Sequence, residues 1–308
     1  MPQSPAPADA AANPLTGDFQ VDIAKSKDLY KRFLAMEQGA RSIVASCRSE
    51  HGIHLWPVVR RAYFADFYRG NAAVYINKNL SVQIGIVEKA RSIPKNFLKI
   101  LTASPKNLGM VFTKKEIHAR VVQGKRYDPY LDPVVQEMQA LGMTPIKLQF
   151  YSGESGPYVI PPAEIPLETS ESFIRFDALP PIPGYRQYVE ASLEYGVPPL
   201  HPSRILQEYS EIRSHAAVFH YILAALQPKF VILEQYYNPV DMGLSLACHE
   251  RGIPCVEYQH GMQDNHIMYT FQHVPRTGFE VVPQWFFTWG ERPANRLRAM
   301  FADQDHHR

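Results

Sequence analysis

Apolar residues recur at helical spacing between residues 203 and 226, in alternating steps of four and three. Ser203 follows Pro202 and is the expected N-cap of this helix. The apolar stripe consists of Ile205, Tyr209, Ile212, Ala216, Phe219, Leu223 and Leu226. A stripe of this length predicts an amphipathic helix of about six turns that packs one face on a core.

The chain after this helix alternates between short apolar runs and a second helix. Residues 230–233 are typical of a buried strand, Pro239 opens a helix, and Gly252 closes it. Residues 253–257 begin another strand. A strand, a helix and a strand within about 30 residues form a βαβ unit, which predicts two parallel strands with a right-handed crossover.

Earlier segments add a second pair of strands. Two apolar runs, 108–112 and 146–150, are predicted to be strands on either side of a helix at 134–141. Residues 151–203 contain many prolines, and we expect a long irregular connection with a short helix near 185–195.

The N-terminal third of the chain is predicted to be helical. Helical spacing is present at residues 26–48, 55–69 and 80–93, and we expect Trp56 to dock on the core with its helix. The helix at 55–69 is both basic and aromatic, which leaves open a peripheral contact with a membrane surface.

Together these elements predict an α/β fold, a Rossmann-like parallel sheet with a helical N-terminal extension. We expect a disordered arm rich in Pro, Ala and Ser at 1–18 and a helical segment at 19–100. The Rossmann-like domain is expected at 101–291, followed by a tail at 292–308 that is long enough for one short helix.

Composition and charge narrow the class of protein. The chain has 308 residues, 45% hydrophobic and 20% charged, which is an ordinary globular mixture. The net charge of +2 lacks the basic excess of proteins that bind duplex DNA or RNA, so no nucleic-acid partner is expected. Cys47, Cys248 and Cys255 are too few for a disulfide framework. The sequence shows neither an apolar stretch of about 18 residues nor a secretory signal, so a cytoplasmic location is expected.

Polar residues follow both strands of the βαβ unit. Glu234 comes after the first strand, and Gln259, His260 and Gly261 come after the second. Ligands of open α/β sheets bind beyond the carboxyl ends of the strands. We therefore expect Glu234 and His260 side by side, where a carboxylate that orients an imidazole makes it a general base. A structural histidine and a capping or ion-paired carboxylate are the alternatives.

Aromatic residues lie next to these positions. Tyr236 and Tyr237 follow the first strand, and His266 and Tyr269 follow the second. A tyrosine offers a sugar ring a flat apolar face and a polar tip. The expected substrate-binding residues are therefore Tyr236, Tyr237, Gln259, Gly261, His266 and Tyr269. Packing in the core is the alternative for the two adjacent tyrosines.

Several common ligand motifs are missing from the sequence. It contains neither GxGxxG nor GxxxxGK[ST], which argues against a standard dinucleotide fingerprint and a P-loop, and it lacks GxSxG. His260, His266 and His273 are six and seven residues apart, so they do not share one helix face. We therefore expect no bound metal and no cofactor.

One arrangement of motifs runs from about residue 50 to residue 291. Its main part comprises Pro228, a strand that leads to Tyr236-Tyr237, a helix, Gly252-Ile253-Pro254, a strand, and Gln259-His260-Gly261. Further parts are GIHLW at 52–56, GKRYD at 124–128 with Asp132-Pro133, and WFFTWG at 285–290. This arrangement resembles the N-terminal half of GT-B-type glycosyltransferases, in particular the bacterial enzymes of capsule and lipopolysaccharide synthesis.

The resemblance implies a single GT-B-like half that serves as an acceptor domain. The implied reaction transfers a sugar from a nucleotide sugar to a glycan acceptor, with His260 as the base that deprotonates the acceptor hydroxyl. In such folds, helix N-termini and basic residues stabilise the leaving phosphate without a bound metal.

The chain departs from this family in one respect. A GT-B enzyme has two Rossmann-like domains, and most of its donor pocket lies in the second. This sequence ends at Arg308, so we expect the donor domain on a separate partner chain, or missing. The alternative is a non-catalytic glycan- or partner-binding protein of the same fold. A nucleotide-binding protein or epimerase is a third interpretation, which the lack of a Gly-rich phosphate loop disfavours.

Overall fold

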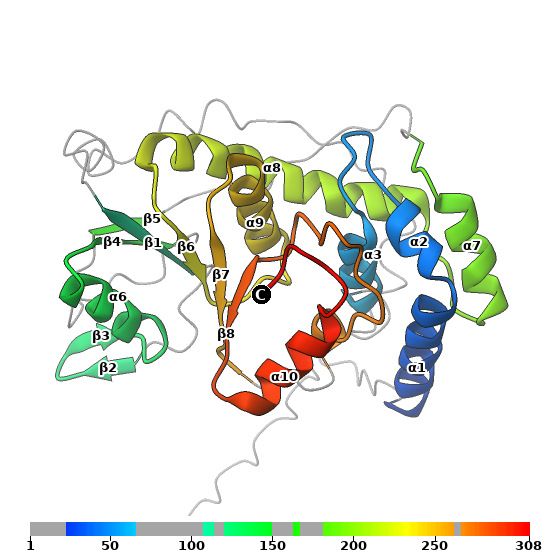
Figure 1. The fold of residues 1–308 in the computed structure, drawn as a ribbon, viewed down its shortest axis with the longest axis horizontal. Helices are drawn as coiled ribbons and strands as arrows, with labels where there is room; N and C mark the ends of the chain where they lie inside the picture. The colour runs from blue at the N-terminus through cyan, green and yellow to red at the C-terminus, as the bar shows by residue number, and fades with distance from the viewer. Residues whose placement is uncertain (1–22, 66–106, 114–119, 150–162, 167–180, 262–265) are drawn as a thin grey trace, which may run out of the picture.

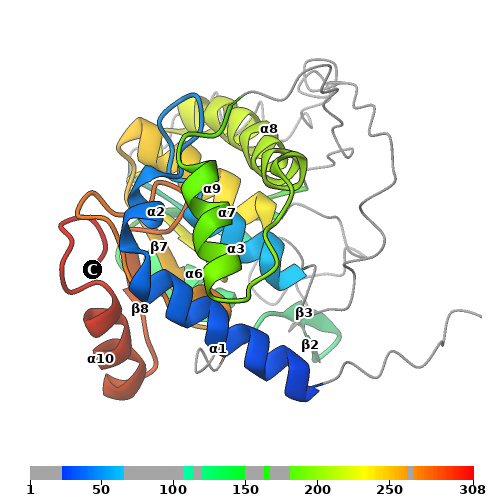
Figure 2. The same ribbon diagram turned by 90° about the vertical axis from the view of Figure 1, so that its right-hand side faces the viewer.

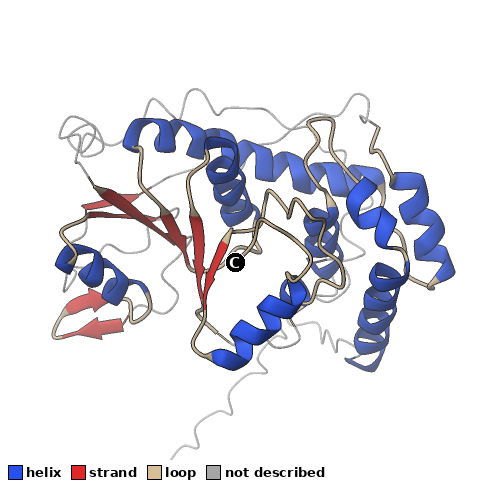
Figure 3. Cartoon of the chain, viewed as in Figure 1, coloured by secondary structure: helices blue, strands red, loops and turns tan. Residues whose placement is uncertain are grey.

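The computed structural model shows one parallel sheet with helices on both faces (Figures 1 and 3). It describes residues 23–65, 107–113, 120–149, 163–166, 181–261 and 266–308. The expected arm at 1–18 and the expected helix at 80–93 lie outside the described residues, as do 150–162 and 167–180 of the irregular connection.

The sheet has the strand order β5-β4-β1-β6-β7-β8, and every neighbouring pair is parallel. Counted along the chain, this six-stranded order is 3-2-1-4-5-6, that of the Rossmann fold. The strands are β1 (Leu108–Thr113), β4 (Thr144–Gln149), β5 (Ala163–Pro166), β6 (Val231–Leu233), β7 (Cys255–Tyr258) and β8 (Trp285–Phe287). The predicted α/β class with a Rossmann-like parallel sheet is confirmed.

The helices form two layers around the sheet. In Figure 1, α8 runs along the upper side with α9 beneath it, and α6 lies on the opposite side. The helices are α1 (Ile23–Gly39), α2 (Arg41–Ser46), α3 (Trp56–Tyr63), α6 (Leu131–Ala140), α7 (Tyr185–Glu194), α8 (Pro202–Leu226), α9 (Pro239–Arg251), the 3₁₀ helix η3 (Ile267–Tyr269) and α10 (Glu291–Met300). A hairpin of β2 (Arg120–Val122) and β3 (Lys125–Tyr127) lies between β1 and α6.

Alternate residues of β1 face opposite layers, because successive side chains of a strand point to opposite sides. Met110 and Phe112 lie in the large hydrophobic core with α8 and α9, and the ring of Phe112 meets that of Phe219 at 5.2 Å. Val111 belongs to a smaller cluster with Val135 of α6. Both faces of β1 are therefore buried, as is typical of a central parallel strand.

The long helix α8 begins at Pro202, two residues earlier than an N-cap at Ser203 implies. His201 is its N-cap, since His201 Nδ1 accepts a 3.3 Å hydrogen bond from the Ser203 backbone N–H. The N-cap role predicted for Ser203 is wrong. Pro202 occupies the first helical position, where its fixed φ angle and missing N–H are tolerated.

Gly243 brings α9 close to α8. A Cβ atom at this position would lie 2.6 Å from His215 Cβ and 2.8 Å from the Ile212 carbonyl oxygen. Because both atoms are fixed to the backbone of α8, we expect Gly243→Ala to lower the free energy of unfolding by about 1–3 kcal/mol, measured by urea unfolding. Gly39→Ala is the matched control, since its Cβ would meet only the tip of the Tyr195 side chain. Equal losses in the two variants would contradict the prediction.

The N-terminal helices share the hydrophobic core of the sheet. Phe33 of α1, Trp56 of α3 and Tyr188 of α7 are fully buried in the same cluster as the strands. The rings of Phe33 and Trp56 stack at 5.7 Å, and Tyr188 meets Trp56 edge-on at 6.1 Å. The predicted docking of Trp56 is confirmed, and Figure 2 shows α1 and α7 together at this end of the molecule. The domain boundary expected at residue 100 stays a prediction.

Arg60 of α3 is buried among these helices. It forms an ion pair with Glu37 of α1 and donates hydrogen bonds to the Ile267 carbonyl oxygen and to Thr270 Oγ1. Trp56 Nε1 donates to the other oxygen of Glu37 at 2.7 Å. Arg60 therefore ties α1 and α3 to the segment around η3.

The basic residues of α3 contact other helices. The neighbour of Arg60, Arg61, forms an ion pair with Glu208 of α8. Among the helices described, none combines the length and the apolar character needed to cross a bilayer. The membrane contact considered for residues 55–69 stays a prediction that these two arginines do not support.

The end of the chain returns to the edge of the sheet. After the expected helix in the tail, α10, the backbone of Arg308 donates to the Gln284 carbonyl oxygen at 2.7 Å and accepts from the Phe286 N–H at 3.0 Å. The Arg308 guanidinium lies 5.2 Å from the centre of the Trp285 ring. The backbone of Arg308 therefore pairs with the outer edge of the sheet at β8.

Candidate functional site

The order of the strands reverses between β1 and β6, and open α/β sheets bind ligands at such a switch point. Thr113 ends β1, and Glu234 directly follows β6. Thr113 Oγ1 donates a 3.2 Å hydrogen bond to Glu234 Oε2, and both side chains are buried. Sequence reasoning finds Glu234 but misses Thr113, although each is the first polar residue after an apolar run.

His260 follows β7, the neighbour of β6, at the same edge of the sheet. His260 Nε2 lies 3.3 Å from the Tyr237 hydroxyl oxygen. Glu234 and His260 therefore stand at the carboxyl ends of adjacent strands, as expected. Since Glu234 bonds Thr113 and His260 bonds Tyr237, the direct pairing of carboxylate and imidazole stays a prediction.

Tyr237 is the centre of an aromatic cluster at this edge. Its ring centroid lies 4.4 Å from that of His266, 5.9 Å from that of Tyr269 and 6.2 Å from that of His260. Tyr237, His260 and His266 are half-buried. The structure thus brings together four of the residues singled out in the sequence. A cluster with flat rings, a hydroxyl and two imidazoles has the chemistry to bind a sugar ring.

Tyr236 and Tyr269 support this cluster from inside the core. Tyr236 donates a hydrogen bond to the Met268 carbonyl oxygen, and Tyr269 donates one to Oε1 of Glu257 on β7. Burial raises the pKa of Glu257 and of both tyrosines. His266 begins η3, because its Nδ1 accepts a 3.3 Å hydrogen bond from the Met268 N–H. Substrate contacts by Tyr236 and Tyr269 stay predictions, and their hydroxyls already have partners within the protein.

Gln259 fixes the turn after β7. Its Nε2 donates to the Gly261 carbonyl oxygen at 2.8 Å, and its Oε1 accepts from the Trp289 N–H at 2.8 Å. Its backbone N–H donates to the Phe287 carbonyl oxygen at 2.9 Å, so Gln259 joins the ends of β7 and β8. A Cβ atom built on Gly261 would meet no atom of the described residues within 4 Å.

Two helices that start at this edge have their N-termini occupied by the protein itself. At α9, Asn238 Oδ1 accepts hydrogen bonds of 3.1 Å from the N–H groups of Val240 and Asp241. At α6, Asp128 Oδ1 accepts hydrogen bonds from the N–H groups of Tyr130, which precedes the helix, and Leu131, its first residue, and Asp132 lies in the first turn. Free N–H groups at a helix start favour phosphate, whereas carboxylates there oppose it. This edge therefore suits a ligand with hydroxyl groups better than one with phosphates.

The described residues offer little for metal or thiol chemistry. No group of three or more His, Cys, Asp and Glu side chains in this part of the chain could hold a metal ion. The three cysteines are buried and not in disulfides. Burial raises the pKa of Cys47 to about 12, so this thiol stays protonated and is not a nucleophile at neutral pH.

Comparison of the sequence with protein-family models gives no match, and comparison with curated proteins gives none. Among solved structures, the chain is similar to UDP-GlcNAc 2-epimerase from Neisseria meningitidis, in a crystal structure bound to UDP-GlcNAc. The TM-score is 0.33 and the sequence identity is 14%, over 63% of this chain and 43% of the epimerase. The chain thus spans less than half of the length of that enzyme. A likeness of this size identifies neither a family nor a function.

Proposed function

We propose that this chain is the acceptor-side domain of a glycosyltransferase of bacterial surface-polysaccharide synthesis. In this proposal, a glycan acceptor binds at the carboxyl edge of the sheet. The observation that carries the proposal is the position of His260, in the aromatic cluster around Tyr237 and just after β7, the neighbour of the strand that Glu234 follows. These residues follow two different strands and share one edge of the sheet.

The chemistry of the proposal follows from His260. Its imidazole takes the proton of an acceptor hydroxyl while the hydroxyl oxygen bonds to the anomeric carbon of the donor sugar. The bond between that carbon and the nucleotide phosphate breaks, and the nucleotide leaves with the electron pair. The 3.3 Å contact between His260 and Tyr237 is long for a hydrogen bond, so an acceptor hydroxyl can replace the tyrosine. Glu234 places a carboxylate at the same edge, which favours the imidazolium that forms.

The donor nucleotide sugar is proposed to be held by a second domain or a partner chain. The occupied N-termini of α9 and α6 support this division, because the N–H groups capped there are not available to a diphosphate. A role in capsule or lipopolysaccharide synthesis, in the cytoplasm or at the inner membrane, belongs to the same proposal and rests on the resemblance of motifs.

The same edge supports a second candidate, a glycan-binding protein without transferase activity. The observation that favours it is that the Gln259 side chain is engaged within the protein. Its amide nitrogen donates to Gly261 and its amide oxygen accepts from Trp289. Of the Gln-His-Gly motif, only His260 then carries a side chain that can do chemistry. The two candidates differ in whether His260 moves a proton.

Thermal unfolding with and without ligands tests the proposed acceptor site. Capsular polysaccharide fragments and lipopolysaccharide core oligosaccharides should raise the melting temperature, since a ligand at 100 times its Kd stabilises by about 2.7 kcal/mol. Tyr237→Ala should lose this response because it removes the centre of the cluster. Tyr221→Ala is the matched control, an exposed tyrosine on α8, and should keep it. A response to UDP or UDP-sugars that Tyr237→Ala abolishes would instead make this edge a nucleotide site and contradict the proposal.

A further inference from the structure

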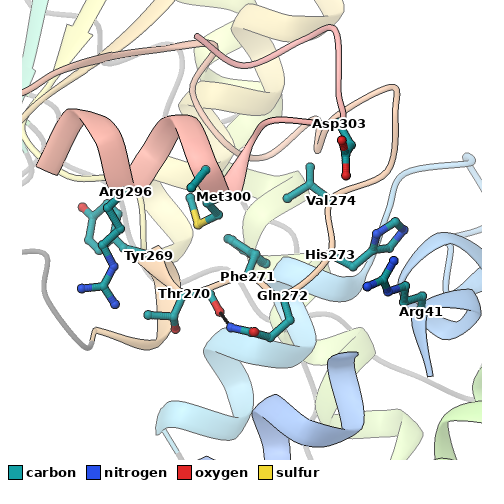
Figure 4. Close-up of a pocket in the computed structure, with 11 residues that line it drawn as sticks. Arg41, Tyr269, Thr270, Phe271, Gln272, His273, Val274, Arg296, Met300 and Asp303 are labelled. Atoms are coloured by element: carbon teal, nitrogen blue, oxygen red, sulfur yellow. Dashed lines mark hydrogen bonds between the residues drawn. The ribbon is translucent and has the colours of Figure 1, made fainter. Parts of the chain in front are cut away.

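A second feature with ligand chemistry is a pocket of about 330 Å³ between α10, the segment after η3 and the start of α2. Figure 4 shows Arg41 and His273 next to each other at one end, Arg296 at the other, and Met300 between them. Asp303 is the one acidic residue of the lining. The pocket therefore has basic groups at both ends of a mostly polar lining.

Among the described residues that line the pocket, Asp303 is the one carboxylate that can balance the charge of Arg41. Neither Arg41 nor His273 makes a hydrogen bond or an ion pair with another described residue. Burial lowers the pKa of His273, the Arg41 charge lowers it further, and Asp303 opposes both effects. A guanidinium beside an imidazole attracts an anion, which would accept hydrogen bonds from both groups.

The volume of the pocket indicates how large the bound anion can be. A volume of about 330 Å³ lies at the lower end of the range for small-molecule sites and exceeds what an inorganic anion fills. The surface that the lining exposes is mostly polar, and Met300 adds an apolar part to it. A ligand with a charged group and a short organic body matches both features.

We propose that this pocket binds a small organic anion, whose phosphate or carboxylate group lies between Arg41 and His273. The site is separate from the acceptor site proposed above and does not depend on it. The two sites are neighbours through Tyr269. This residue lines the pocket together with Thr270, and its ring contacts that of Tyr237 in the aromatic cluster.

Calorimetric titration of the full chain tests the site with three probes: sulfate, glucose 1-phosphate and citrate. Glucose 1-phosphate or citrate should bind more tightly than sulfate, and the tighter of the two identifies the charged group. Arg41→Gln should weaken that binding by about tenfold or more, since a hydrogen bond to a charged group is lost. Arg298→Gln is the matched control on α10, an exposed arginine outside the pocket, and should bind like the natural chain.

The pH dependence of sulfate binding isolates the part of His273, because sulfate keeps its charge between pH 5.5 and pH 7.5. The charged groups that act on His273 are Arg41 of α2 and Asp303 after α10, and Arg296 of α10 lies at the other end of the pocket. A bound anion raises the pKa of His273, so binding takes up a proton and should tighten as the pH falls. His273→Gln should remove this dependence.

Three results would overturn the proposal. They are unchanged binding in Arg41→Gln, equal losses in Arg41→Gln and Arg298→Gln, and sulfate binding as tight as that of both organic anions. Melting temperatures of the variants without ligand separate a loss of binding from a loss of folding.

Discussion

Replacing Arg60 with alanine should lower the free energy of unfolding at pH 7 by about 3–5 kcal/mol, because the change leaves the Glu37 carboxylate buried without its partner. Arg60 and Glu37 are both fully buried. The variant also removes the donor to the Ile267 carbonyl oxygen and to Thr270. Urea unfolding at pH 7 and at pH 5 measures the loss.

The pH dependence of this loss has a definite sign. Burial already raises the pKa of Glu37, and the Arg60 charge opposes that rise. Without Arg60 the folded-state pKa climbs further above the unfolded value, so stability is lost as the pH rises through the folded-state pKa. The deficit of Arg60→Ala should therefore be smaller at pH 5 than at pH 7.

Two further variants test whether the stranded Glu37 charge causes the loss of stability. The double variant Glu37→Gln, Arg60→Met keeps an acceptor for Trp56 Nε1 and removes both charges. It should therefore lower the free energy of unfolding less than Arg60→Ala alone. Arg186→Ala breaks an exposed ion pair with Glu190 and should leave stability unchanged. A double variant as unstable as the single one would show that lost hydrogen bonds, and not the stranded charge, cause the effect.

Replacing His260 with alanine should reduce the rate of sugar transfer by about 10²–10⁴-fold, the usual contribution of a general base. The assay combines this chain with a donor-binding partner, a nucleotide sugar and an acceptor oligosaccharide. Since His260 is half-buried at the edge of the core, the fold should survive, which circular dichroism checks. His220→Ala, a change to an ion-paired histidine on α8, is the matched control.

The result for His260 also separates the two candidate functions. A loss of transfer with retained glycan affinity supports a base. A transfer rate equal to that of the natural chain would remove the catalytic role. If no transfer occurs with any donor partner while glycans still bind, the glycan-binding candidate replaces the enzyme.

The central βαβ unit could be predicted because its signals are local and agree with one another. Three local signals mark helix boundaries that the structure confirms. They are the last apolar residue of the α8 stripe, Leu226, then Pro239 at the start of α9 and Gly252 after its end. Once two strands are parallel, the residues that follow them must meet at one edge. This is why Glu234 and His260 could be placed at adjacent strand ends from the sequence alone.

The parts that could not be predicted depend on contacts between distant segments. The four-residue strand β5 contains a proline and pairs with β4 alone. Its extended conformation depends on this pairing, and its sequence has no strand pattern that would predict it. Arg60 lies on a basic helix and looks exposed in sequence, yet its partner Glu37 is on another helix. The anion pocket joins Arg41 to His273 across more than 200 residues, which no local pattern indicates.

Arg308 affects how the molecule behaves in solution. β8 is the outermost strand on its side, with Trp285 38% exposed and Phe287 52% exposed. A bare edge strand with such side chains invites pairing with a strand of another molecule. Because the backbone of Arg308 already bonds that of Gln284 and Phe286, part of this edge is closed to a strand of another molecule.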